Sequence, residues 1–237
     1  MIIEFIGKAV LITEGKERIV VVSDLHLGYG QSLRESGYQI NVNLYKEIIN
    51  NFELIFGKIG KVGKVIILGD LKHVFGSILR DEWKEVLDLL DYLKEKCKEI
   101  IIIKGNHDIF TEFIIKKRGI KIVDYYLASS YAFLHGDRDF EEIYSEKIKY
   151  WFVGHCHPAV MLKEGVKQEK YKCFLVGRFK GKKVIILPSF FPAVEGSYVK
   201  SLFGKEVGLA WDFNFDNFEV KIVDGLKVLE FGKLKEI

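Results

Sequence analysis

Short apolar runs alternate with helical patterns along the first two thirds of the chain, and this alternation constrains the fold most. Two stretches, at about 42–56 and 81–96, place apolar residues at helical spacing. Between and after them lie five runs rich in β-branched and aromatic residues, at 19–22, 65–68, 100–103, 131–134 and 150–153. Strands separated by helices of this length indicate βαβ units and a mostly parallel sheet.

The pattern changes after about residue 158. Turns containing Gly or Asp-Asn separate short strands predicted at 171–179, 182–187, 206–213, 217–223 and 226–231, so this part is expected to be antiparallel. The aromatic stretch 211–218 is expected to pack in this second sheet. No repeat or linker interrupts the 237 residues. We therefore predict a single α/β domain over 1–237, with two sheets sharing one core and helices outside.

Composition excludes several other classes of protein. The net charge of +3 neither requires nor excludes a nucleic-acid partner. The three cysteines form no C-x-x-C pair, which favours a reducing compartment over a disulfide scaffold. No apolar run approaches the ~20 residues of a membrane helix, and the first residues do not resemble a secretory signal. We expect a cytoplasmic protein without a membrane partner. Lys enrichment with few Gln indicates a thermophilic source, although genome base composition biases codons the same way.

All six histidines lie within a few residues of the carboxyl end of a predicted strand. Asp, Asn and Gly accompany them, and the carboxyl ends of strands are where open α/β sheets place ligand sites. A lone His in such a place is more often a hydrogen-bonded surface or core residue. Five clusters at five successive strand ends are hard to explain by chance: Asp24 and His26; Asp70 and His73; Asn106, His107 and Asp108; His135; His155 and His157.

The spacing and the residue types favour a metal site. In an extended segment residues i and i+2 point the same way, so Asp24 and His26 are expected to face one cavity while Leu25 packs inward. His155 and His157 follow the same rule, with Cys156 as a packing residue. Carboxylate, imidazole and amide ligands suit Mn, Fe, Zn or Ni. About seven ligands exceed what one ion needs, so two divalent ions sharing one carboxylate are expected, with manganese as the first choice.

These clusters, in order, resemble the motifs of the calcineurin-like metallophosphoesterases: D-x-H, G-D-x-x-(D/H), G-N-H-(D/E), a later H and G-H-x-H. The match covers residues 19–160, and 161–237 form the mainly antiparallel remainder. The resemblance implies a two-sheet αββα sandwich with metals at the strand ends. It also implies His107 as phosphate contact and leaving-group acid. The implied ligands are Asp24, His26 and His157 for one metal, Asn106, His135 and His155 for the other, and Asp70 bridging them.

A narrower resemblance is carried by His73 after Gly-Asp-Leu-Lys and by the segments 25–28, 154–160, 172–174 and 187–190. These are similar to the short SbcD-related phosphoesterases, which include archaeal proteins and the PdeM group of ligase-associated DNA endonucleases. The similarity implies DNA as substrate and DNA-repair helicases or ligases as partners. The capping and coiled-coil attachment regions of full SbcD nucleases are missing, so a processive, ATPase-coupled role is not expected.

We therefore predict hydrolysis of nucleic-acid phosphodiesters by a hydroxide that bridges the two metals, with His107 as the acid. The chain lacks both a G-x-S-x-G elbow and a phosphate-binding G-x-x-x-x-G-K-[ST] loop. His73 either supports His107 or the phosphate, or makes a structural hydrogen bond. Asp108 either assists His107 or caps a helix.

The substrate stays open at this level. Tyr29, Arg34, Tyr38 and Lys72 are expected near the mouth of the site, where they could contact a DNA backbone or stack on bases. A phosphodiesterase or phosphatase for small molecules would use the same metals. A non-catalytic scaffold, like the retromer subunit of this fold, is disfavoured because no ligand is missing. The basic tract 163–183 is either a solvated hairpin face or a DNA track.

Overall fold

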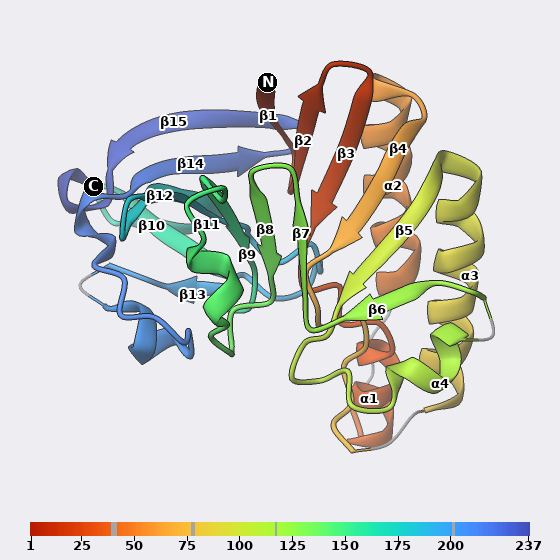
Figure 1. Ribbon diagram of the computed structural model, residues 1–237. Helices are drawn as coiled ribbons and strands as arrows, with labels where there is room; N and C mark the ends of the chain where they lie inside the picture. The colour runs from red at the N-terminus through yellow and green to blue at the C-terminus, as the bar shows by residue number, and fades with distance from the viewer. Residues whose placement is uncertain (39–41, 77–78, 117, 201) are drawn as a thin grey trace.

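Two β-sheets lie face to face in the computed structural model, which describes residues 1–38, 42–76, 79–116, 118–200 and 202–237. The α-helices cover the outer face of the first sheet, on the right in Figure 1, and the second sheet lies on the left. The two-sheet α/β architecture predicted from the sequence is confirmed.

The first sheet joins an N-terminal hairpin to three parallel additions. Its strands follow chain order: β1 Ile2–Ile6, β2 Ala9–Glu14, β3 Glu17–Val22, β4 Val62–Ile67, β5 Cys97–Ile103 and β6 Lys121–Val123. Pairing is antiparallel from β1 to β3 and parallel from β3 to β6. The parallel part therefore presents the carboxyl ends of β3, β4 and β5 at one edge.

The helices are α1 Tyr29–Glu35, α2 Leu44–Ile59, α3 Arg80–Lys96 and α4 Thr111–Lys116. The side chain of Asn43 starts α2 by accepting a hydrogen bond from the main-chain N of Lys46, at 3.0 Å. Helix α3 has acidic residues in its first turn and basic residues in its last turn, which complement its dipole. Both long helices bury one apolar face against the first sheet, as their sequence periodicity predicts.

The second sheet runs in the order β13–β10–β11–β12–β9–β8–β7, with β14 beside β11 and β15 beside β14. The predicted antiparallel pairing holds for β10–β11–β12 and for β14–β15, whereas β8, β9 and β12 pair in parallel. The strands are β7 Tyr125–Ala128, β8 Tyr131–Leu134, β9 Tyr150–Val153, β10 Pro158–Glu164, β11 Lys167–Phe179, β12 Lys182–Ile186, β13 Ser197–Tyr198, β14 Glu219–Asp224 and β15 Lys227–Lys233.

The strand predicted at 206–213 is wrong. This stretch begins in the 3₁₀ helix η2, Gly204–Val207, and then folds back, so that the main-chain N of Gly204 donates to the carbonyl of Phe213 at 2.9 Å. Trp211 and Phe213 are buried on the outer face of the second sheet rather than paired within it. Their alternation with polar residues imitates a strand. This aromatic layer, together with η1 (Glu141–Tyr144) and η3 (Phe215–Asn217), covers the face where outer helices were expected.

A third apolar cluster fills the space between the sheets. Val21, Ile66 and Ile101 of the first sheet pack there with Phe133 and Phe152 of the second. The sheets face each other so that the carboxyl ends of β3, β4 and β5 converge with those of β8 and β9. Within the described residues, no helix is long and apolar enough to cross a membrane.

Candidate metal centre

The converging strand ends bring the predicted ligands together in two groups. Asp24, His26 and His157 form one, with their candidate ligand atoms within 4.8 Å of one another, and Asp70, His135 and His155 form the other on the same measure. The side-chain oxygen of Asn106 lies 3.0 Å from Nε2 of His135, beside the second group. All seven ligand candidates therefore share one site.

Asp70 lies between the two groups. Its Oδ2 is 3.8 Å from Nε2 of His26, and its Oδ1 is 3.5 Å from Nε2 of His135. Each carboxylate oxygen thus faces one group. The side chain is almost fully buried, so this orientation is imposed by the protein.

The backbone at these residues is left-handed rather than extended. The φ angles are 53° at Asp24, 46° at His26, 69° at His155 and 46° at His157. The extended geometry predicted for these segments is wrong, yet its consequence holds, because the residues between them, Leu25 and Cys156, are buried in the apolar clusters. Left-handed backbone costs a non-glycine residue roughly 1–3 kcal/mol and concentrates at functional sites.

Two glycines permit the close packing around the ligands. A Cβ on Gly105 would lie 2.3 Å from Oδ1 of Asp70. A Cβ on Gly154 would lie 2.0 Å from Oγ of Ser23, the residue whose hydroxyl donates to Asp24. A side chain at Gly105 would displace Asp70, and one at Gly154 would displace Ser23, as expected from glycines beside a crowded site.

The hydrogen bonds in the centre leave acceptor atoms facing one another. Nδ1 of His135 donates to the carbonyl of Leu68 at 2.7 Å, so Nε2 is an acceptor whenever the ring is neutral. That nitrogen faces the oxygens of Asn106 and Asp70. Among the described residues, Nδ1 of His26 is buried and has no hydrogen-bond partner. Converging lone pairs of N and O suit a bound divalent cation, and this donor set fits the ions expected from the sequence.

The pKa values point the same way. Burial, and to a lesser extent the neighbouring carboxylate of Asp24, raise the pKa of Asp70 to about 7 against the lowering effect of His135. Burial alone would raise the pKa of Asp24 too, but the surrounding histidines, His157 first, bring it below its usual value. Two buried carboxylates side by side repel each other. Divalent cations would offset this repulsion and keep both ionised.

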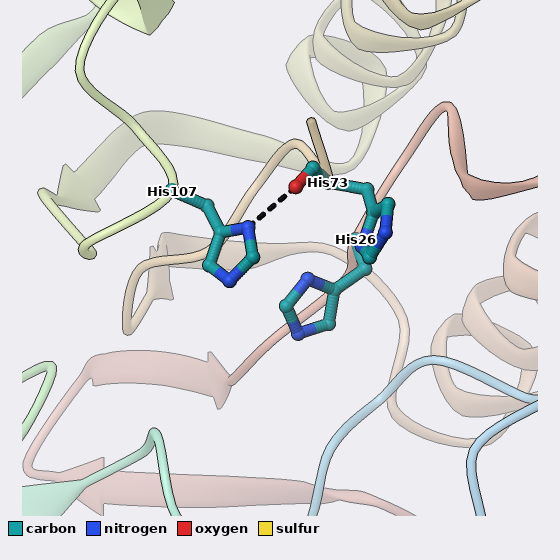
Figure 2. Close-up of side chains that lie close together, drawn as sticks. All are labelled: His26, His73 and His107. Atoms are coloured by element: carbon teal, nitrogen blue, oxygen red, sulfur yellow. Dashed lines mark hydrogen bonds between the residues drawn. The ribbon is translucent and has the colours of Figure 1, made fainter. Parts of the chain in front are cut away.

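His107 lies close to the ligand candidate His26 and to His73 (Figure 2). Its main-chain N donates to Oδ1 of Asp70 at 3.1 Å, and its ring Nδ1 donates to the carbonyl of His73. This bond fixes the ring, so that Nε2 points inward and lies 3.8 Å from Oδ2 of Asp70. His73 therefore contacts His107 through its main chain. The two rings are 5.6 Å apart, and burial lowers the pKa of both imidazoles.

The structure corrects the catalytic role predicted for Asp108. Its side chain is fully buried behind the site, and its carboxylate accepts from the main-chain N of Gly105 at 3.0 Å and of Leu71 at 3.2 Å. It also accepts from the hydroxyl of Thr111, the first residue of α4, at 3.0 Å. These bonds tie the loop that carries His107 to the loop after β4. Asp108 therefore has a structural role, which is close to the helix-capping alternative expected from the sequence.

The structure also corrects Lys72 as a substrate contact. Its side chain is 0% exposed, and its Nζ lies 4.0 Å from Oε2 of Glu82, which is equally buried. A Lys beside a site motif was read as a surface residue because nothing local in the sequence shows that Glu82 lies opposite it.

Of the remaining substrate candidates, Tyr29 and Arg34 line a cavity of about 360 Å³ that has His26 in its wall. Arg34 is ion-paired with Asp81 at 2.7 Å. Tyr38 is 64% exposed and is not part of this lining.

Sequence reasoning missed two aromatic residues at the centre. Phe191 lines the same cavity, and its ring lies 5.1 Å from that of Tyr29. Phe75 lies with its ring 4.0 Å from the ring of His107 and is 54% exposed. The segment 187–190, which takes part in the narrower resemblance, was a signal for Phe191. For Phe75 the available signal was its position two residues after His73.

The chain is similar to one known protein family and to several solved structures. The calcineurin-like phosphoesterase family profile matches residues 17–223. The crystal structure of Pseudomonas putida nuclease MPE aligns with 97% of this chain and 94% of its own, with a TM-score of 0.61 and 15% identity. The crystal structure of Vps29 from Entamoeba histolytica complexed with zinc aligns with 90% of this chain and 97% of its own, with a TM-score of 0.39 and 14% identity. A search of curated protein sequences finds no match. Because the profile spans most of its length, the chain belongs to the calcineurin-like phosphoesterase family.

Proposed function

We propose that this chain is a phosphodiesterase that uses two divalent metal ions to hydrolyse nucleic acid. Membership of the family already makes it a metal-dependent hydrolase of phosphoesters. The proposal adds the number of ions and the substrate. The observation that carries it is the position of Asp70, which turns one carboxylate oxygen to each of the two ligand groups.

In this proposal Asp24, His26 and His157 hold one ion. Asn106, His135 and His155 hold the other, and Asp70 serves both. Manganese is the first candidate, and Fe, Zn and Ni accept the same mixed set of N and O donors.

When bound, two such ions supply the positive charge that orients a phosphate and lowers the pKa of the attacking water. The hydrogen bonds of His107 support its role as the acid that protonates the leaving group. Because Nδ1 is engaged by the carbonyl of His73, Nε2 is the atom available to protonate the departing oxygen. Burial lowers the pKa of His107, which makes a proton on Nε2 easier to transfer. General acids of this kind contribute typically ~10²–10⁴ in rate.

Charge favours a diester over a monoester. A monoester dianion is best bound by several cationic side chains, but the two arginines near the site already have acidic partners. Arg34 pairs with Asp81 at 2.7 Å, and Arg138 pairs with Asp124 at 2.9 Å. A diester carries a single negative charge, and the aromatic rings of Tyr29 and Phe75 could stack on bases. The name of the structural relative, a nuclease, also supports a nucleic-acid substrate.

The second candidate is a phosphodiesterase for small nucleotides. The cavity beside His26, at about 360 Å³, is of a size for one nucleotide rather than for a duplex. The same experiment separates the two candidates.

Purified protein with Mn²⁺ is offered single-stranded, branched and duplex DNA, RNA, cyclic nucleotides, and aryl mono- and diesters. We expect DNA or RNA to be cleaved, and cleavage to fall between about 50 and 200 mM salt while hydrolysis of an aryl diester barely changes. The Asp24→Ala variant, which lacks a proposed ligand, controls for contaminating nucleases. Faster turnover of nucleotide or aryl monophosphates than of any nucleic acid would replace the nuclease proposal by the small-molecule alternative.

A further inference from the structure

The segment 189–191, between β12 and β13, lies directly against the ligand Asp24. We call it the 189–191 strap. The hydroxyl of Ser189 and the main-chain N of Phe191 both donate to the carbonyl of Asp24, at 2.9 and 3.2 Å. The main-chain N of Phe190 donates to the carbonyl of Ser23 at 2.8 Å. The strap therefore holds the backbone of Ser23 and Asp24, where Asp24 has its left-handed conformation.

Two lysines hold the strap from its other side. Lys172 of β11 donates to the carbonyls of Ser189, at 3.0 Å, and of Phe191. Lys8, in the turn between β1 and β2, donates to the carbonyl of Phe190 at 2.9 Å. Each of three consecutive strap carbonyls thus accepts a bond from a lysine. One lysine comes from each sheet, so the strap is fixed to both.

These lysines are unusual in their surroundings. Burial lowers the pKa of Lys172 to about 7 and that of Lys8 to about 8, because an ammonium is costly to remove from water. Removal of either lysine would leave its carbonyl partners without a donor, which is costly away from water. The partners here are the strap carbonyls.

Asp24 needs external support. Its φ of 53° is disfavoured for a non-glycine residue, and such a conformation persists only where its surroundings impose it. The two hydrogen bonds from the strap to its carbonyl are part of that support.

We propose that Lys172 and Lys8 are positioning residues of the metal centre, which act through the 189–191 strap to hold Asp24 in ligand geometry. The inference rests on the proposed metal site, and it goes beyond it by assigning a metal-affinity role to residues that touch neither metal nor substrate. The ion held by Asp24, His26 and His157 depends on them more than the other ion does.

The chain offers a matched control in Lys182 of β12. This lysine is 8% exposed and also donates to two main-chain carbonyls, of Ser145 and Ile148, both at 2.8 Å. Neither carbonyl belongs to the strap. Lys172→Met and Lys182→Met therefore remove the same kind and number of bonds, one pair behind Asp24 and the other elsewhere.

The experiment titrates Mn²⁺ into metal-free wild type and both variants by calorimetry, and measures urea unfolding of the metal-free proteins. We expect both variants to lose stability. Lys172→Met should lower the affinity for one of the two ions at least tenfold and change the affinity for the other less than about threefold. Lys182→Met should change neither affinity by more than about threefold. Lys172→Arg, which keeps a donor, should recover part of the affinity, and Lys8→Met should weaken the same ion less, because it removes one bond.

Equal affinities in wild type and Lys172→Met, or equal losses in Lys172→Met and Lys182→Met, would overturn the positioning role. Wild type that binds one ion would instead overturn the two-ion proposal. If Lys172→Met does not fold, Lys172→Arg and Lys8→Met decide the question: unchanged affinity in both would refute the inference.

Discussion

Replacing Glu82 by Gln should destabilise the protein more than replacing its neighbour Lys72 by Met. Both side chains are 0% exposed, with Nζ and Oε2 4.0 Å apart. Glu82 also accepts hydrogen bonds from the main-chain N of His73 and of Val74, both at 2.9 Å, and of Leu79 at 3.2 Å. The carboxylate therefore keeps three donors when the lysine is removed, whereas the lysine loses its anion when Glu82 is neutralised.

The magnitudes follow from this asymmetry. In Glu82→Gln the carbonyl oxygen of the amide can still accept two of the three main-chain bonds, but the buried Lys72 ammonium loses the negative charge of Glu82 while it keeps its bond to the carbonyl of Val74. Breaking a buried pair in this way costs about 3–5 kcal/mol. In Lys72→Met the carboxylate stays hydrogen-bonded, and the cost should be about 1–3 kcal/mol. The double variant removes the unbalanced charge, so it should be more stable than Glu82→Gln alone.

The assay is urea unfolding of the metal-free proteins, followed by circular dichroism, with the slope m compared to confirm a common transition. The expected order of stability is wild type, Lys72→Met, the double variant and Glu82→Gln. A loss in Lys72→Met as large as in Glu82→Gln would refute the reasoning. Unchanged stability in Lys72→Met, combined with weaker DNA binding, would restore the substrate role that the structure removes from Lys72.

Three further outcomes are expected. His107→Ala should keep its metal and lose about 10²–10⁴ in turnover, less so with nitrophenolate leaving groups that need no proton; loss of metal would show that its role is wrong. Phe75→Ala should raise KM for nucleic acid about 5- to 150-fold, the equivalent of ~1–3 kcal/mol of stacking, and spare small alkyl diesters; equal effects on both would contradict stacking. Burial and the neighbouring Lys8 lower the pKa of Lys172, while Asp24 raises it, and the net value is about 7. Between about pH 7 and 10.5 the folded state therefore binds fewer protons than the unfolded state. Stability should therefore rise with pH across this window, and the rise should shrink in Lys172→Met; an identical rise would exclude Lys172 as its source.

The sequence could predict which candidate metal ligands lie close together, because its signals are local. Parallel strands end at one edge, so polar clusters after β3, β4 and β5 had to meet, and those after β8 and β9 joined them once the sheets packed face to face. The spacing of Asp24 and His26 predicted that both side chains face one site, which holds, but it predicted an extended backbone, which is wrong. Two residues separated by one buried residue point the same way in an extended chain, and here alternate left-handed residues achieve the same result.

The long-range contacts could not be predicted in this way. The bond from Ser189 to Asp24 joins residues 165 positions apart, and no local pattern specifies it. Lys72 was placed outside because lysines usually are, and its buried partner Glu82 is visible only after α3 packs. The false strand at 206–213 came from an alternation of aromatic and polar residues that reflects packing against a sheet rather than pairing within one.

The number of metal ions bound per chain decides whether two ions share Asp70. Metal-free protein is titrated with Mn²⁺ by calorimetry, and bound metal is counted after gel filtration, for wild type and for Asp70→Asn. The account predicts two ions per chain in wild type and weaker binding of both in the variant, because each carboxylate oxygen faces one ligand group. A single ion in wild type, or two ions of which Asp70→Asn weakens only one, would contradict it.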